Sequence, residues 1–111
     1  LDSSWLSVPD AAEVLDLAPR TLRNMIRDGE LVTCRVEGLT GARVPSAFLA
    51  GGRLVDGLRG SITQLRDSGM DDGAVVRWLL EPHEELGSSP AAALAAGQKH
   101  AVRRAALPLA F

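Results

Sequence analysis

Apolar residues near the start of the chain recur at the spacing of an amphipathic helix. The residues that follow the i, i+3, i+4, i+7 pattern are Ala11, Val14, Leu15 and Ala18. Acidic residues occupy the opposite side of this stretch. Ser7 is a good N-cap, and Pro9 suits the first turn because its missing N–H costs little there. The pattern predicts a first short helix with an acidic outer face.

A second apolar stripe follows at Leu22, Met25 and Ile26. It predicts a helix over residues 19–28, with Gly29 just beyond its end, where a left-handed conformation commonly ends a helix. The polar residues on the opposite face are Arg20, Thr21, Arg23, Asn24 and Arg27. Arginine binds guanine with two hydrogen bonds and asparagine binds adenine, and both also bind phosphate. A merely solvated charged face is the alternative interpretation, and periodicity alone does not separate the two.

The following stretch predicts a β-hairpin, or wing, over residues 31–45. Residues 31–36 alternate and are rich in β-branched side chains, residues 37–41 form a polar loop with two glycines, and Arg43-Val44 returns before Pro45. Arg35 and Arg43 are candidates for contacts to a DNA backbone or minor groove. Cys34 is expected to be a small packing residue, and as the single cysteine it excludes an internal disulfide.

The rest of the chain predicts helices. Ser46 is expected to cap a short turn with Phe48 buried, and residues 54–55 to form a brief extended piece. Four helices are then expected, over 62–68 capped by Ser61, from a cap at Asp71 or Asp72 to Pro82, from Ser89-Pro90 to Ala96, and over 99–107. The predicted fold is mainly α with a small β-hairpin wing. A winged helix-turn-helix unit (1–57) precedes a C-terminal helical bundle (58–111).

Composition and charge limit the classes of function that this chain can have. The 111 residues are 46% hydrophobic and lack an apolar run of roughly 20 residues or a signal-peptide pattern, so we expect a cytoplasmic protein. The net charge is −2, but residues 19–53 contain six arginines against three acids, a local charge of +3. Any binding to nucleic acid should therefore be modest in affinity and strongly salt-dependent. Only four aromatic residues occur, which disfavours a stacking platform for single strands, and Trp5 is expected to cover the core of the winged unit.

Residues for catalysis or metal binding do not assemble into a recognisable pattern. His83 and His100 lack an i, i+4 partner, and one cysteine cannot build a structural zinc site. The adjacent acids at 71–72 and 84–85 are explained by capping and solvation. We expect no enzymatic activity, no catalytic residue, no metal and no cofactor.

Residues 8–38, VPDAAEVLDLAPRTLRNMIRDGELVTCRVEG, resemble the winged helix-turn-helix of the excisionase and MerR type. The whole chain resembles an actinobacterial family of small winged-helix DNA-binding proteins through Trp5-Leu6 and residues 44–49, 77–79 and 109–111. The resemblance implies duplex DNA binding, by a transcriptional regulator or nucleoid-type factor. The positions it points to are Arg20, Thr21, Arg23, Asn24 and Arg27 on the second helix and Arg35 and Arg43 on the wing. Relatives have Ser or Thr as the cap of the second helix, where this chain has Ala18.

A second resemblance leaves an alternative function open. Trp78-Leu79, residues 86–90 and Val102-Arg103 resemble the C-terminal domain of Xre-type antitoxins, which supports dimerisation and toxin contact. This implies a protein-interaction module, with a homodimer or partner bound through residues 78–104. The other interpretation is a helical cap that completes the hydrophobic core of the winged unit.

Overall fold

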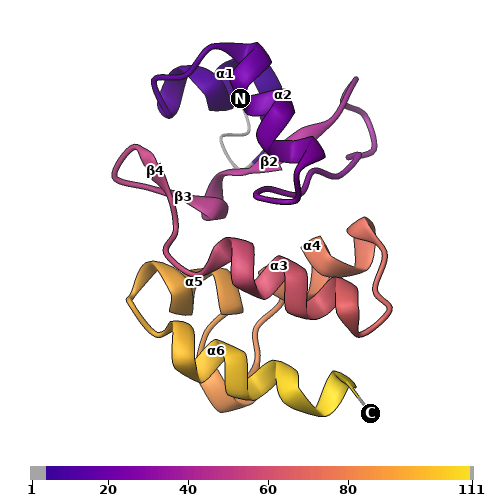
Figure 1. The fold of residues 1–111 in the computed structure, drawn as a ribbon, viewed down its shortest axis with the longest axis vertical. Coiled ribbons are helices and arrows are strands. Elements are labelled where there is room, and N and C mark those ends of the chain that lie inside the picture. Colours follow the sequence, from indigo (N-terminus) through magenta and orange to yellow (C-terminus); the bar gives the residue numbers. More distant parts are fainter. Residues whose placement is uncertain (1–4, 111) are drawn as a thin grey trace.

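The computed structural model describes residues 5–110. Its N-terminal unit consists of β1 (Trp5–Ser7), α1 (Val8–Val14), α2 (Pro19–Arg27) and β2 (Arg43–Pro45). The two strands pair antiparallel, with Trp5 opposite Pro45 and Ser7 opposite Arg43. This unit lies at one end of the molecule, and the C-terminal helices lie at the other (Figure 1).

The two first helices begin as the sequence predicts, but the buried side of α1 differs. The Ser7 Oγ accepts a hydrogen bond from the Asp10 N–H at 3.2 Å, which confirms the N-cap. Ala11 is buried and Leu15 is half-buried against the core, as predicted, whereas Val14 is 47% exposed and Ala18 is exposed. Ala12, which the pattern did not include, is buried in their place. Small alanine side chains let α1 approach its neighbours α2 and β1 closely, and this close packing selects the inner face.

The wing is less regular than a two-stranded hairpin. Residues 31–36 form no regular strand, because the only ladder contact of this arm with β2 is a single bridge. Leu31 and Val32 are both fully buried, so the predicted alternation does not hold there. The first arm meets β2 at one bridge, in which the backbones of Cys34 and Arg43 exchange N–H···O bonds of 3.0 and 2.7 Å. The regular strand partner of β2 is β1, a strand that the sequence pattern did not predict.

A short connecting segment joins the wing to the helices. It contains the 3₁₀ turn η1 (Ser46–Phe48) and a second small sheet of β3 (Leu49–Ala50) and β4 (Arg53–Leu54). Phe48 is fully buried as predicted. Ser46 is not the cap, since Pro45 holds that position without a side-chain bond. The predicted extended piece at 54–55 is displaced by one residue and pairs with β3.

The C-terminal half contains α3 (Leu58–Asp67), α4 (Asp72–Leu80), η2 (Glu84–Leu86), α5 (Pro90–Ala95), α6 (Lys99–Ala106) and η3 (Leu107–Ala110). Asp71 and Ser89 cap α4 and α5, accepting bonds from the N–H groups of Ala74 at 2.8 Å and Ala92 at 3.1 Å. Ser61 is not a cap: α3 begins one turn earlier, after Gly57, and Ser61 is buried inside it.

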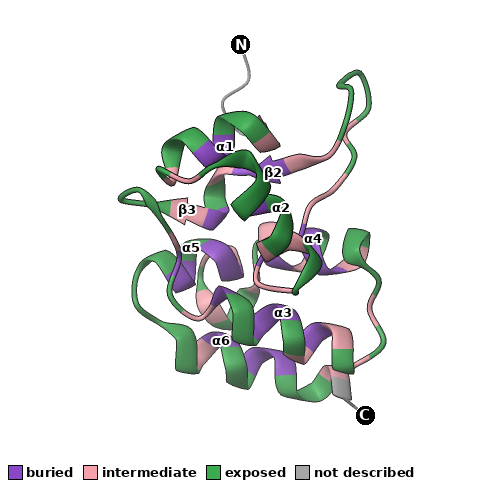
Figure 2. Ribbon diagram, turned by 45° about the horizontal axis from the view of Figure 1, so that its top comes forward, coloured by how far each residue is buried: buried purple, intermediate pink, exposed green. Residues whose placement is uncertain are grey.

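One hydrophobic core connects the two halves. Its buried members include Leu22, Val44 and Phe48 from the N-terminal half and Ile62, Leu79 and Val102 from the C-terminal half. Buried segments line the facing sides of the elements in both halves (Figure 2). Ala91 and Ala93 are buried where α5 contacts α4, α6 and η1, so the alanine-rich helix helps to complete this core.

Two further predictions concern the ends of the chain and its relation to membranes. The resemblance to the actinobacterial family includes Phe111, which lies outside the described residues. Over residues 5–110, every helix is too short or too polar to cross a lipid bilayer.

Candidate nucleic-acid interface

The outward face of α2 carries all five polar side chains that the sequence singled out. Each of them is exposed, namely Arg20, Thr21, Arg23, Asn24 and Arg27. The opposite side of the helix is anchored by Leu22, which is fully buried, with Met25 and Ile26 half-buried beside the core. The helix is therefore fixed by its apolar side, and its polar side faces solvent (Figure 2).

Most of the positive charge on this face of α2 is not neutralised by nearby acidic residues. Within the described part of the chain, Arg20 and Arg23 form no ion pair. The Arg27 Nε lies 3.6 Å from the Asp28 Oδ1, and both side chains are mostly exposed, so water and salt weaken this contact. Three guanidinium groups on one helix face are thus available to an anionic partner.

An arginine from the C-terminal half pairs with Glu30, the second acid after the end of α2. The Arg59 Nη1, at the start of α3, lies 3.5 Å from the Glu30 Oε1. This pairing reduces the negative charge beside the exposed arginines, although both side chains retain access to solvent. The pair is not predictable from the sequence, because 28 positions separate the two residues and no local pattern connects them.

The start of α2 has no side-chain cap. Ala18 occupies the N-cap position and makes no side-chain hydrogen bond, and Pro19 at the first turn has no N–H to donate. The helix start therefore offers fewer backbone donors to an anion than a helix with an ordinary first residue. Recognition by α2 depends correspondingly more on its side chains.

The two candidate arginines of the wing differ in their surroundings. Arg35 is exposed, whereas Arg43 is half-buried and folds back onto the wing loop. The Arg43 Nη2 donates a hydrogen bond to the Thr40 carbonyl oxygen at 2.8 Å. Its Nε is buried with no hydrogen-bond partner in the described region. The structure therefore places Arg35 with the exposed cations and Arg43 within the framework of the wing.

The anchoring of Arg43 left a weak signal in the sequence. Thr40 precedes Arg43 by three residues, and Gly38 and Gly41 flank the turn with φ of +85° and +78°. The two left-handed glycines bend the loop, and the Arg43 side chain reaches the carbonyl oxygen three residues earlier. The charge of Arg43 alone predicted a DNA contact, whereas the turn accounts for its contact with the wing loop.

Cys34 occupies the bridge between the arms of the wing. It is half-buried, and its Sγ lies 3.9 Å from the Arg43 carbonyl oxygen. Burial disfavours the charged thiolate and raises the pKa of the Cys34 thiol above its ordinary value. The thiol is thus suited to packing rather than to nucleophilic chemistry, as the sequence position predicted.

Two short helices, an exposed polar face on the second and a wing after it define a winged helix-turn-helix protein. A family model described as a helix-turn-helix domain matches residues 5–45. A second, described as the Rv2175c C-terminal domain of unknown function, matches residues 55–110. The chain belongs to this Rv2175c family, which agrees with the predicted resemblance to an actinobacterial family.

Comparisons with known proteins support the same relationship. The chain is 33% identical over 86 residues to "DNA-binding protein Rv2175c" of Mycobacterium tuberculosis (strain ATCC 25618 / H37Rv). The match covers 77% of this chain and 58% of that protein, so the chain spans little more than half of the relative's length. The NMR structure of Rv2175c superposes with a TM-score of 0.80 at 30% identity, over all of this chain and 85% of that one. The predicted fold class is confirmed.

Proposed function

We propose that this protein binds duplex DNA, with α2 in the major groove and the wing on the flanking backbone. The observation that carries the proposal is the exposed, largely unpaired face of Arg20, Arg23 and Arg27 on a helix whose other side is buried in the core. An α-helix fits the major groove, and helix-turn-helix proteins insert their second helix there. The name of the mycobacterial relative, a DNA-binding protein, supports the same function.

We assign the contacts with DNA to individual side chains. Arg20, Arg23 and Arg27, together with Thr21 and Asn24, contact base edges and phosphates from α2. Arg35 contacts the backbone from the wing, since phosphate contacts need only an accessible positive charge. Arg43 acts indirectly, because its bond to Thr40 holds the wing loop in place.

The cellular role follows from this binding. The protein acts in the cytoplasm as a transcriptional regulator or nucleoid-type factor and performs no catalysis. It uses no metal or cofactor, and DNA is its partner. The local charge of +3 over residues 19–53 against a net charge of −2 favours short contacts near α2 over a long basic track.

Charge reversal on α2 tests the proposal. Fluorescence anisotropy of a mixed-sequence duplex should show that Arg23→Glu reduces the affinity at least tenfold, because a phosphate-facing cation becomes an anion. Arg104→Glu is the matched control, since Arg104 is also exposed but lies on α6 in the other half of the molecule. Equal affinities of the two folded variants would refute the assignment of α2.

The positions of the small residues argue against the alternative function, which is a dimer or partner interface over residues 78–104. Ala91, Ala93 and Leu94 are buried within the chain itself, which is the arrangement expected of a core-completing cap. We therefore propose that the C-terminal helices chiefly support the winged unit. Sedimentation at rising protein concentration tests this, because a stable dimer would show that the helices also present an interface.

A further inference from the structure

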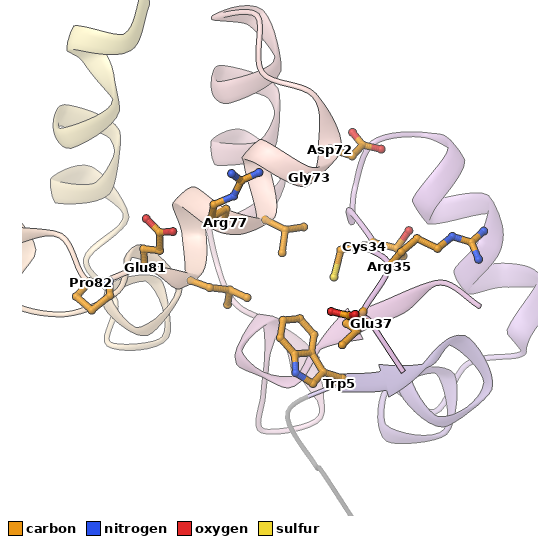
Figure 3. Close-up of a pocket in the computed structure, with 13 residues that line it drawn as sticks. Trp5, Cys34, Arg35, Glu37, Asp72, Gly73, Arg77, Glu81 and Pro82 are labelled. Atoms are coloured by element: carbon orange, nitrogen blue, oxygen red, sulfur yellow. The ribbon is translucent and has the colours of Figure 1, made fainter. Parts of the chain in front are cut away.

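A cavity of about 860 Å³ separates the wing from α4. Its walls come from Trp5 on β1, from residues 33–37 of the wing, and from residues 72–73, 76–77 and 80–82 on α4 and the turn after it. These elements surround an open space in the close-up view (Figure 3). The volume lies within the range of roughly 300–1,000 Å³ that is typical of small-molecule sites.

The interior of the cavity is mainly apolar. The apolar side chains that line it are Trp5, Val36, Val76, Leu80 and Pro82. Trp5 is half-buried and lies outside the hydrophobic core that it was expected to cover, so that expectation is wrong. An indole at the wall of a cavity offers a large apolar and π-electron surface to a ligand.

The charged groups around the cavity are arranged unevenly. In the view of Figure 3, the Glu37 carboxylate projects on the same side as the Trp5 indole, whereas the guanidinium groups of Arg35 and Arg77 point away from Trp5. Across residues 5–110, Glu37 and Glu81 take part in no ion pair, and neither do Arg35 and Arg77, while Asp72 pairs with Arg66 at 2.8 Å. Of these unpaired charges, the one on the side of the Trp5 indole is the Glu37 carboxylate (Figure 3).

We propose that this cavity binds a small hydrophobic cation, such as an aryl- or alkylammonium. The apolar body lies against Val76 and Leu80, and the positive charge lies between the Trp5 indole and the Glu37 carboxylate. Aromatic faces attract cations, the more strongly when the cation is partly desolvated, and a carboxylate adds direct charge pairing. The ligand contacts the wing and α4 together, which gives the C-terminal domain a role as one wall of a binding site.

Titration of the full chain with benzyltrimethylammonium tests this proposal. We expect saturable NMR shifts at the Trp5 indole N–H and at the methyl groups of Val76 and Leu80, with weaker binding of uncharged benzyl alcohol and anionic phenylacetate. Equal binding of the three probes would overturn the charge assignment. No saturable shift at millimolar probe, or shifts confined to residues outside the cavity, would overturn the site.

Two variants in the cavity and one control variant outside it separate charge recognition from folding. Glu37→Gln keeps the shape of an exposed side chain and should weaken benzyltrimethylammonium binding about tenfold, whereas Glu13→Gln on α1, outside the cavity, should leave it unchanged. Trp5→Leu keeps an apolar wall but removes the π surface, and should also weaken binding. Unchanged affinity in both cavity variants would contradict the proposal.

Cys34 provides an independent readout because it also lines the cavity. Bound benzyltrimethylammonium should slow alkylation of the Cys34 thiol by iodoacetamide in proportion to occupancy. If benzyltrimethylammonium binds but the alkylation rate of Cys34 does not change, the ligand lies outside the cavity and the proposal is refuted.

Discussion

The Arg43 Nη2 lies 2.8 Å from the Thr40 carbonyl oxygen, so the Arg43 side chain on β2 holds the loop at the tip of the wing in place. The same residue bridges to Cys34 through two backbone hydrogen bonds. A residue with these contacts shapes the wing, whereas the exposed Arg35 on the other arm is available to a partner. The two arginines of the wing should thus respond differently to mutation.

Arg43→Ala should lower the free energy of unfolding by about 1 kcal/mol, because a side-chain hydrogen bond and its packing are lost. Urea denaturation measures this difference. Arg35→Ala should leave stability unchanged and weaken DNA binding, with a smaller dependence on salt. The account of the wing fails if Arg35→Ala is the destabilising variant and Arg43→Ala is not.

Gly57 sits at a crowded turn where the chain enters α3. It has a φ of +89°, and a Cβ there would lie 2.8 Å from the Lys99 Cβ and 3.2 Å from the Leu94 Cδ2. Gly57→Ala should therefore cost about 2–4 kcal/mol, from backbone strain and overpacking together. Thermal and urea unfolding check this cost.

Gly51→Ala is the matched control for Gly57→Ala. Gly51 also has a positive φ, of +60°, but among residues 5–110, apart from Gly51 and its two chain neighbours, no atom lies within 4 Å of a Cβ built there. Gly51→Ala should therefore lower the free energy of unfolding by about 1 kcal/mol, from backbone strain alone. Equal losses of stability in the two variants would show that the contact with α6 does not matter.

Phe48 should contribute strongly to stability because it belongs to the core shared by the two halves. It is fully buried on η1, which contacts α5. Phe48→Ala should lower the free energy of unfolding by about 3–5 kcal/mol. Leu39→Ala, at a wing position that is 40% exposed, should have little effect, and a similar loss in both variants would contradict the burial.

The Cys34 thiol should react slowly with alkylating reagents at neutral pH. Burial raises its pKa, so a smaller fraction is thiolate than in a free cysteine at the same pH. The rate of iodoacetamide reaction should rise with pH to a midpoint above that of the unfolded chain in urea. A midpoint at or below the value for the unfolded chain would indicate an activated thiol instead.

Local sequence signals predicted the helices well. Ser7, Asp71 and Ser89 cap the helices that their positions predicted, because an N-cap depends on only a few neighbouring residues. The polar face of α2 was likewise predictable, since the period of 3.6 residues places its five side chains together. The family resemblance added the function that such a face serves.

Features that depend on distant residues were not predictable from one sequence. β1 becomes a strand because β2 offers it a free edge, and Leu31-Val32 is buried because both side chains belong to the core shared with distant elements. The ion pair between Arg59 and Glu30 and the cavity between the wing and α4 also need the halves in place. The inward position of Arg43 reflects a turn geometry that charge counting does not include.

The salt dependence of duplex binding tests the central claim most directly. Anisotropy titrations at several salt concentrations should give a linear decrease of log K with log salt for the full chain, with a slope of about −0.9 for each neutralised phosphate. Arg23→Ala should make the slope smaller by about 1, while Arg104→Ala should leave it unchanged. Absence of binding at low salt, or the same slope in Arg23→Ala as in the full chain, would contradict the proposal that α2 engages DNA.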